Sequence, residues 1–244
     1  MSPWLRWPLS LLLIAATPAH AQQLSGFDFM SPATQALQKD DAQNPAFLWL
    51  KDGEQRFGTT CARCHNASSL RGMAARYPAW DAVAAKPITL SARIQQCQLR
   101  HVKGAPLAAE SEALLGLETF VGHASRGLPV EPPKDARLER HVELGARLYG
   151  RRMGQLDLSC AQCHDDHAGR RLAGSTIPQA HPTGYPLYRL EWQAVGSVQR
   201  RLRQCMNGVR AEPYAFGSDE LTALELYLKQ RAAGMTIETP AVRP

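Results

Sequence analysis

Two short stretches of the chain have a spacing that can attach a metal-bearing cofactor. Both read Cys-x-x-Cys-His, at residues 61–65 and 160–164. Two cysteines at this spacing form thioether bonds to the vinyl groups of a haem, and the adjacent histidine binds its iron from one side. A zinc ion held by the four cysteines would leave both histidines without a role. We therefore expect two covalently bound haem c groups, attached by Cys61, Cys64 and His65 in the first motif and by Cys160, Cys163 and His164 in the second.

Two further cysteines, Cys97 and Cys205, complete the six in the chain. Each follows one motif at an equivalent position, which no methionine or histidine does. A soft thiolate is a suitable iron ligand and is deprotonated by binding the metal. We expect the axial pairs His65 with Cys97 and His164 with Cys205. The alternative is a disulfide between Cys97 and Cys205, the ordinary outcome for two cysteines in an oxidising compartment.

Positive charge gathers around Cys205. Four arginines lie within five positions of it: Arg200, Arg201, Arg203 and Arg210. If this stretch is helical, Arg201 lies one turn before Cys205 on the same face. Guanidinium groups lower a thiol pKa and bind oxyanions through forked hydrogen bonds, so a sulfur oxyanion is the expected substrate, held by Arg201 with Arg203 or Arg210. Alternatively, these arginines pair with haem propionates or line a solvated face.

The two motifs belong to an internal repeat. Residues 91–97 (SARIQQC) match 199–205 (QRRLRQC), and residues 106–128 match 213–235 without a gap. Such a repeat predicts two copies of one structural unit.

Each copy has a helical pattern of apolar residues. The spacing predicts one helix over 47–61 and another over 142–160, each running into its motif. It predicts a second helix in each copy, capped by Ser111 or Ser218. The expected fold class is all-α, a tandem of two cytochrome c-type domains related by internal duplication.

The N-terminal end of the chain suggests export. Arg6, an apolar run over 9–16 and small residues up to Ala21 are typical of a secretory signal peptide; an uncleaved anchor is the alternative. No later segment is apolar enough to span a membrane, so we expect a periplasmic protein.

Prolines 129, 132 and 133 interrupt any helix between the two copies of the repeat and mark the boundary between them. The expected divisions are a signal peptide (1–21), an extended or partly disordered N-terminal extension (22–45), a first cytochrome c domain (46–130) and a second, active-site domain (136–244).

The net charge indicates which classes of substrate and partner to expect. It is +6, or +5 once the segment that contains Arg6 is removed, which favours anionic substrates or acidic partners. The arginines are not interleaved with stacking aromatic residues, so we expect no nucleic-acid binding.

The motifs, the two lone cysteines and the stretch RRLRQCMNGVRAEPYAFGSDELTALELYL resemble the SoxA family, the dihaem cytochrome subunits of the SoxAX complex of bacterial sulfur oxidation. This resemblance implies an L-cysteine S-thiosulfotransferase, which couples thiosulfate oxidatively to a cysteine of the carrier protein SoxYZ. It implies SoxX as the partner cytochrome and a downstream c-type cytochrome as acceptor, with electrons leaving through haem. Cys205 would be haem ligand and catalytic sulfur, and Arg201 would steer thiosulfate.

Three other activities are compatible with two haem motifs. A pure electron-transfer cytochrome would be indifferent to thiosulfate. A thiosulfate dehydrogenase would make tetrathionate without a protein carrier. A dihaem peroxidase would need an open iron site, which two thiolate ligands disfavour.

Overall fold

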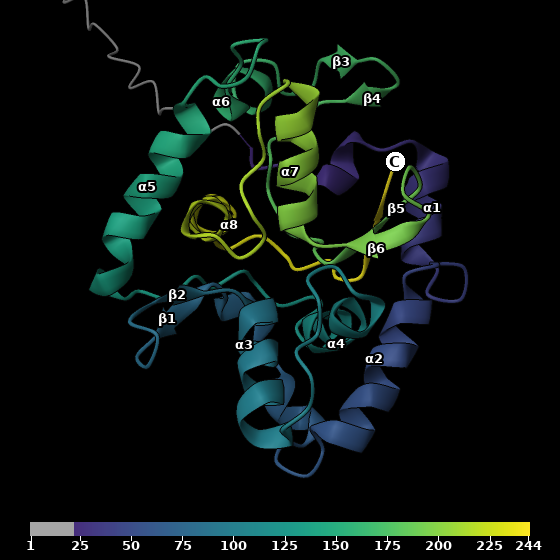
Figure 1. Ribbon diagram of the computed structural model, residues 1–244. Coiled ribbons are helices and arrows are strands. Elements are labelled where there is room, and N and C mark those ends of the chain that lie inside the picture. The colour runs from purple at the N-terminus through teal and green to yellow at the C-terminus, as the bar shows by residue number, and fades with distance from the viewer. Residues whose placement is uncertain (1–21) are drawn as a thin grey trace, which may run out of the picture.

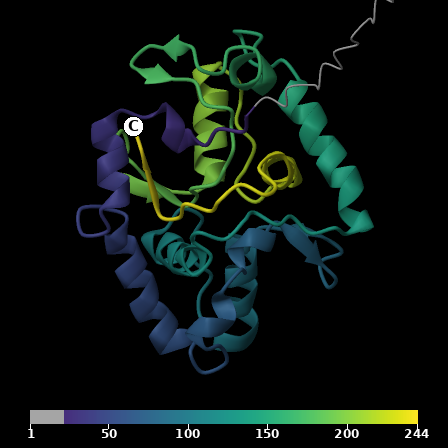
Figure 2. The same ribbon diagram turned by 180° about the vertical axis from the view of Figure 1, so that it is seen from behind.

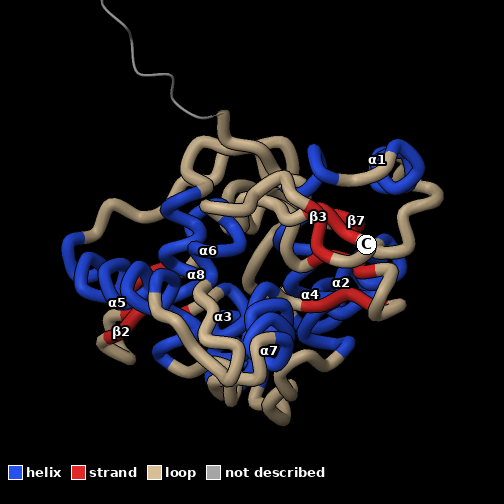
Figure 3. Tube along the Cα trace, turned by 90° about the horizontal axis from the view of Figure 1, so that it is seen from above, coloured by secondary structure: helices blue, strands red, loops and turns tan. Residues whose placement is uncertain are grey.

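The computed structural model describes residues 22–244, so the expected signal peptide at 1–21 lies outside the described residues. In Figure 1 the C-terminal half lies above, residues 47–123 lie below, and the segment 26–39 lies in the upper part beside the C-terminal half. Helices form most of the regular structure and the strands are short (Figure 3). The N-terminal half contains α1 (Pro32–Lys39), α2 (Phe47–Thr60), β1 (Ala79–Asp81), β2 (Lys86–Ile88), α3 (Leu90–Cys97), a π-helical turn (Gln98–Val102) and α4 (Glu112–His123). The C-terminal half contains α5 (Glu139–Gly150), α6 (Cys160–His164), β3 (Arg171–Leu172), β4 (Ser175–Thr176), β5 (Leu187–Arg189), β6 (Ala194–Gly196), α7 (Val198–Gly208), α8 (Asp219–Arg231) and β7 (Ala241–Arg243).

One close helix crossing organises each half. Helix α2 packs against α4, and α5 packs against α8. A Cβ atom added to Gly53 of α2 would lie 1.9 Å from the carbonyl oxygen of Gly116, and one added to Gly145 of α5 would lie 2.2 Å from that of Ala223. Gly116 and Ala223 are equivalent in the repeat. The same backbone-to-backbone contact therefore occurs twice.

Each half has its own apolar core, and a third cluster joins them. Phe57, Leu117 and Val121 belong to the core of the first half. The joining cluster packs Ala46 and Leu115 of the first half against three residues of the second. The core of the second half consists of Leu148, Tyr149, Met206, Leu221, Leu224 and Leu228, and the second half adds Tyr188, Val195 and Val242 to the joining cluster.

Equivalent β-hairpins directly precede the two helices that carry Cys97 and Cys205. Strands β1 and β2 pair antiparallel before α3, and β5 and β6 do so before α7. Thr89 and Ser197 then cap the two helices by accepting hydrogen bonds from backbone N–H groups of the first turn. Strand β7 pairs in parallel with β5, which brings the C-terminal end beside α1 (Figure 2). The hairpins therefore fix where α3 and α7 begin.

Most of the expected helices are confirmed, with corrections. Helix α2 covers the predicted range, and Ser111 and Ser218 cap α4 and α8. The helix predicted over 142–160 is wrong beyond Gly150, because the chain turns there and pairs Met153 with Leu158.

Two further expectations need revision. The N-terminal extension over 22–45 is not an extended arm, since it contains α1. The helical fold is accompanied by small sheets that an all-α description omits. Within residues 22–244, no helix combines the length and the apolar character that crossing a membrane requires.

We predict opposite effects for two alanine substitutions within α2. Gly53→Ala should lower the free energy of unfolding by about 1–3 kcal/mol or more, because its methyl group meets the backbone of α4. Gly58→Ala, whose methyl group would have no heavy atom within 4 Å, should raise it by about 0.5–1 kcal/mol. Denaturant unfolding of the purified protein measures both, and an equal effect of the two substitutions would contradict the close crossing.

Candidate functional site

The first cavity lies in the N-terminal half and has a volume of about 530 Å³. Cys61, His65 and Cys97 line it together with apolar side chains of the first core. Burial raises the pKa of the Cys61 thiol, and the nearby Cys97 raises it further. The fold therefore brings the lone cysteine to the motif of its own half. Met73 and His101 also line this cavity.

The second cavity lies in the C-terminal half and has a volume of about 160 Å³. His164, at the end of α6, and Cys205, on α7, both line it, and the imidazole ring lies close enough to lower the pKa of the Cys205 thiol. His164 Nδ1 lies 2.7 Å from the carbonyl oxygen of Pro178. Because a carbonyl only accepts, Nδ1 carries the proton and Nε2 is the nitrogen free to bind a metal.

The environment of Cys205 favours the thiolate. Burial raises its pKa, but the neighbouring His164 and the positive charges of Arg201 and Arg189 outweigh burial, so the pKa lies below its ordinary value. Cys160 behaves differently: burial, followed by the neighbouring Cys205, raises its pKa to about 11. The two sulfurs are therefore close enough to influence each other.

The two lone cysteines do not form the alternative disulfide. All six cysteines are free, and Cys97 and Cys205 line different cavities. Each instead lies with the motif histidine of its own half.

The hairpin residues give the two cavities different electrostatics. In the first half, Arg93 forms an ion pair with the buried carboxylate of Asp81 at 2.8 Å. The matching residues of the second half are Arg201 and Arg189, so an arginine stands where the first half has an aspartate. Both arginines line the second cavity. Burial and the like charge of Arg201 lower the pKa of Arg189.

The two guanidinium groups at the second cavity keep hydrogen-bond donors that no acceptor in the described part of the chain uses. Arg189 binds Glu191 through Nη2 at 3.0 Å, but its buried Nε has no hydrogen-bond partner within residues 22–244. Arg201 donates to the neutral amide of Gln204 at 2.8 Å. Two like-charged groups with spare donors beside a thiol form a favourable site for an anion.

The other expected arginines lie elsewhere. Arg203 donates to the carbonyl oxygen of Tyr214 and lies over the Phe216 ring, and Arg210 is an exposed residue with positive φ just after α7. Neither lines the second cavity, so their contact with substrate stays a prediction.

Sequence reasoning missed Arg189. The ungapped match of 199–205 to 91–97 extends upstream, so that 187–189 aligns with 79–81. Extending the repeat in this way would have exposed the exchange of Asp81 for Arg189.

The residues present fit a haem at each cavity. Each cavity combines a histidine and a cysteine, two axial ligands of different type, with a thioether-forming cysteine pair in the adjacent motif. No group of three or more His, Cys, Asp or Glu residues arranged for a metal ion occurs within residues 22–244. A haem iron needs only two protein ligands, since its porphyrin supplies the others.

Comparison with known proteins identifies the class of these domains. The family model described as "SoxA/TsdA, cytochrome c domain" matches residues 47–130 and 144–237. The chain thus carries two domains of the cytochrome c class.

Individual relatives show which family within this class the chain belongs to. An L-cysteine S-thiosulfotransferase subunit SoxA of Pseudaminobacter salicylatoxidans is 36% identical, over 90% of this chain and 80% of the relative. The corresponding subunit of Rhodovulum sulfidophilum is 33% identical, over 96% and 87%. The crystal structure of SoxXA from P. pantotrophus matches with a TM-score of 0.87 and 30% identity, over 91% of this chain and 87% of that one. The chain belongs to the SoxA family.

Proposed function

We propose that this chain is the catalytic subunit of a periplasmic L-cysteine S-thiosulfotransferase, which joins thiosulfate oxidatively to a cysteine of the carrier protein SoxYZ. The observation that carries this proposal is the second cavity, where the Cys205 thiol lies with Arg201 and the incompletely satisfied Arg189. Thiosulfate is a dianion with a nucleophilic outer sulfur. It therefore needs both a sulfur partner and cationic contacts.

Two covalently bound haem c groups complete the proposed holoprotein. Cys61 and Cys64 would attach the first, and Cys160 and Cys163 the second. His65 with Cys97 and His164 with Cys205 would bind the irons. When bound, haem would supply a one-electron acceptor beside the thiol, which is chemistry that side chains cannot provide.

The side chains around the second cavity have separate roles in this account. Cys205 would hold the substrate sulfur as a mixed sulfur adduct before its transfer to the carrier thiol. Arg201 and Arg189 would bind the oxyanion end and orient the outer sulfur toward Cys205. The carbonyl oxygen of Pro178 would keep His164 in the tautomer that presents Nε2. Arg203 and Arg210 remain candidates for a second contact with substrate or carrier.

The proposed assembly follows from the family. The relative of known structure is titled SoxXA, which supports SoxX as the partner of this chain. SoxYZ would be the carrier and a c-type cytochrome the final acceptor. We propose that the signal peptide occupies residues 1–21, that residues 22–45 are an extension, and that the two cytochrome c domains span 46–130 and 136–244.

A second candidate activity is thiosulfate dehydrogenation to tetrathionate. The matching family model covers both SoxA and TsdA, and the same arginine pair could bind a second thiosulfate. This activity and pure electron transfer differ from thiosulfotransfer in one requirement, because only thiosulfotransfer consumes the carrier thiol.

We predict that the mature protein contains two haem groups in covalent linkage. Mass spectrometry under denaturing conditions should give the mass of residues 22–244 plus two haems. Replacing both Cys61 and Cys64 with serine should remove one haem. A wild-type mass that contains one haem or none would contradict the assignment.

We predict that Cys205→Ser abolishes transfer of thiosulfate to SoxYZ while both haems remain attached, because serine cannot form the sulfur adduct. The measurement is the mass increase of SoxY in the presence of thiosulfate and an oxidised cytochrome. Retained transfer would exclude Cys205 as the catalytic sulfur, and thiosulfate oxidation without SoxYZ would favour the dehydrogenase.

We predict that Arg189→Asp lowers kcat/KM for thiosulfate by at least about 10- to 100-fold, the effect of losing one charged hydrogen bond. The new carboxylate would pair with Arg201 as Asp81 pairs with Arg93. Arg147→Gln is the matched control, because Arg147 is exposed and its one ion pair within residues 22–244 is 3.9 Å long. A role restricted to haem propionates would instead change the haem spectrum and leave the KM for thiosulfate unaltered.

A further inference from the structure

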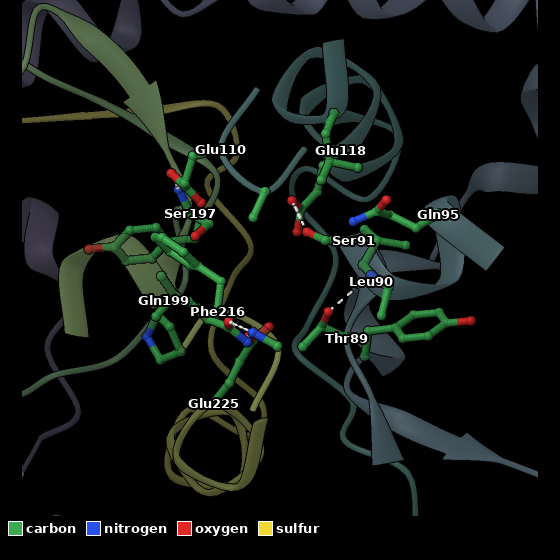
Figure 4. Close-up of a pocket in the computed structure, with 18 of the residues that line it drawn as sticks. Thr89, Leu90, Ser91, Gln95, Glu110, Glu118, Ser197, Gln199, Phe216 and Glu225 are labelled. Atoms are coloured by element: carbon green, nitrogen blue, oxygen red, sulfur yellow. Dashed lines mark hydrogen bonds between the residues drawn. The ribbon is translucent and has the colours of Figure 1, made fainter. Parts of the chain in front are cut away.

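A third cavity lies between the two halves and borders both cysteine–histidine cavities, sharing Tyr77 with the first and Tyr185 with the second. This interface cavity has a volume of about 130 Å³. Figure 4 shows Glu118 on α4 and Glu225 on α8 on opposite sides of it. The two glutamates are equivalent in the repeat that relates 106–128 to 213–235. The internal duplication therefore brings two copies of one acidic position to a shared space.

The ionisable side chains of this cavity are buried. Glu118 is 8% exposed, Glu225 is 7% exposed and Lys229, which also lines the cavity, is 9% exposed. Ser91 donates a hydrogen bond to Glu118, and Gln199 donates one to Glu225 at 3.3 Å. No hydrogen bond or ion pair within residues 22–244 involves the ammonium group of Lys229, and this nitrogen is not among the fully buried side-chain atoms, so it keeps some accessible surface.

The unpartnered lysine indicates that the cavity contains water. An ammonium group has three donors, and burying it without acceptors is strongly unfavourable. One ordered water needs about 10–15 Å³ of such space, so the interface cavity has room for several. Water molecules there can bridge Lys229 to the carboxyl groups and carry protons between them.

The charges around the cavity do not balance when all groups are ionised. Glu110, Glu118 and Glu225 supply three carboxylates, Lys229 supplies one positive charge, and Tyr77 and Tyr185 are the other titratable side chains of the lining. Burial and the neighbouring carboxylates raise the pKa of Glu118 to about 8 and that of Glu225 to about 7. At least one carboxyl group therefore holds a proton near neutral pH.

The cluster is connected to both cysteine-bearing helices at equivalent places. Ser91 lies in the first turn of α3 and Gln199 in the first turn of α7, each six residues before the cysteine of its helix. Six residues correspond to about 9 Å along a helix. Coulomb interactions between partly buried groups extend over lengths of this order, because salt screens them only weakly. A change of charge at either cysteine–histidine cavity therefore changes the electrostatic potential at the glutamates of the interface cavity.

We propose that Glu118, Glu225 and Lys229, together with enclosed water, form one proton-binding site shared by the two halves, which responds to the charge at the cysteine–histidine cavities. This inference rests on the haems of the proposed function: if dithionite gives one electron to a haem held beside one of those cavities, the added negative charge would draw a proton from solvent water to a carboxylate oxygen, which becomes a carboxylic acid. When the charge is removed, the proton returns to solvent. No bond other than the O–H bond forms or breaks.

Infrared difference spectroscopy of the holoprotein tests this site. Oxidised and dithionite-reduced samples at pH 7 are compared in the region of the carboxylic C=O stretch, in H₂O and in D₂O. The variants are Glu118→Gln and Glu225→Gln, which keep the side-chain size. Glu143→Gln is the matched control, because Glu143 is an exposed glutamate on α5.

The proposal predicts a D₂O-sensitive carboxylic acid band in the difference spectrum of the wild type. Glu118→Gln or Glu225→Gln should remove or displace the band, and Glu143→Gln should leave it unchanged. Proton uptake on reduction, followed with a pH indicator in weakly buffered solution, should fall in the same two variants. A wild-type spectrum without such a band, or a band and proton uptake equal in all four proteins, would overturn the proposal.

Discussion

The contact between the Cys205 thiol and the His164 ring is the constraint on which the second half of the chain depends. The two residues are far apart in sequence and lie on different helices, α6 and α7. Their contact requires that Ser159 begins α6, that the β5–β6 hairpin directs α7 along the cavity, and that Pro178 orients the imidazole. A local motif alone cannot bring the thiol there. The tertiary fold of the half brings Cys205 to the position of the proposed second ligand.

The same architecture occurs twice, but charge makes the two copies different. In the first half, Asp81 neutralises Arg93, and the cavity is large and mainly apolar. In the second half, Arg189 replaces the carboxylate, and two guanidinium groups face the smaller cavity that contains Cys205. A like-charged pair is unfavourable when empty and favourable around an anion. One substitution within a duplicated hairpin thus leaves an arginine pair without a carboxylate between them at the second cavity, where we propose that the anion binds.

The sequence could predict the motifs, the repeat, the helix caps and the face shared by Arg201 and Cys205, because these depend on local spacing. It could not predict the short strands, since segments of two or three residues such as Leu187–Arg189 acquire their pairing from tertiary contacts. It also failed beyond Gly150, where residues that fit a helical pattern form a turn instead. The anion site was identified incompletely because Arg189 is distant in sequence from Cys205.

Electron paramagnetic resonance of the oxidised holoprotein tests most directly the claim that Cys205 is both a haem ligand and the reactive sulfur. Wild type is compared with Cys205→Met and, as a matched variant of the other half, Cys97→Met. The account predicts two low-spin signals of the thiolate type, of which each variant loses a different one. Signals typical of histidine–methionine or bis-histidine ligation, unchanged by Cys205→Met, would contradict it and favour a plain electron carrier.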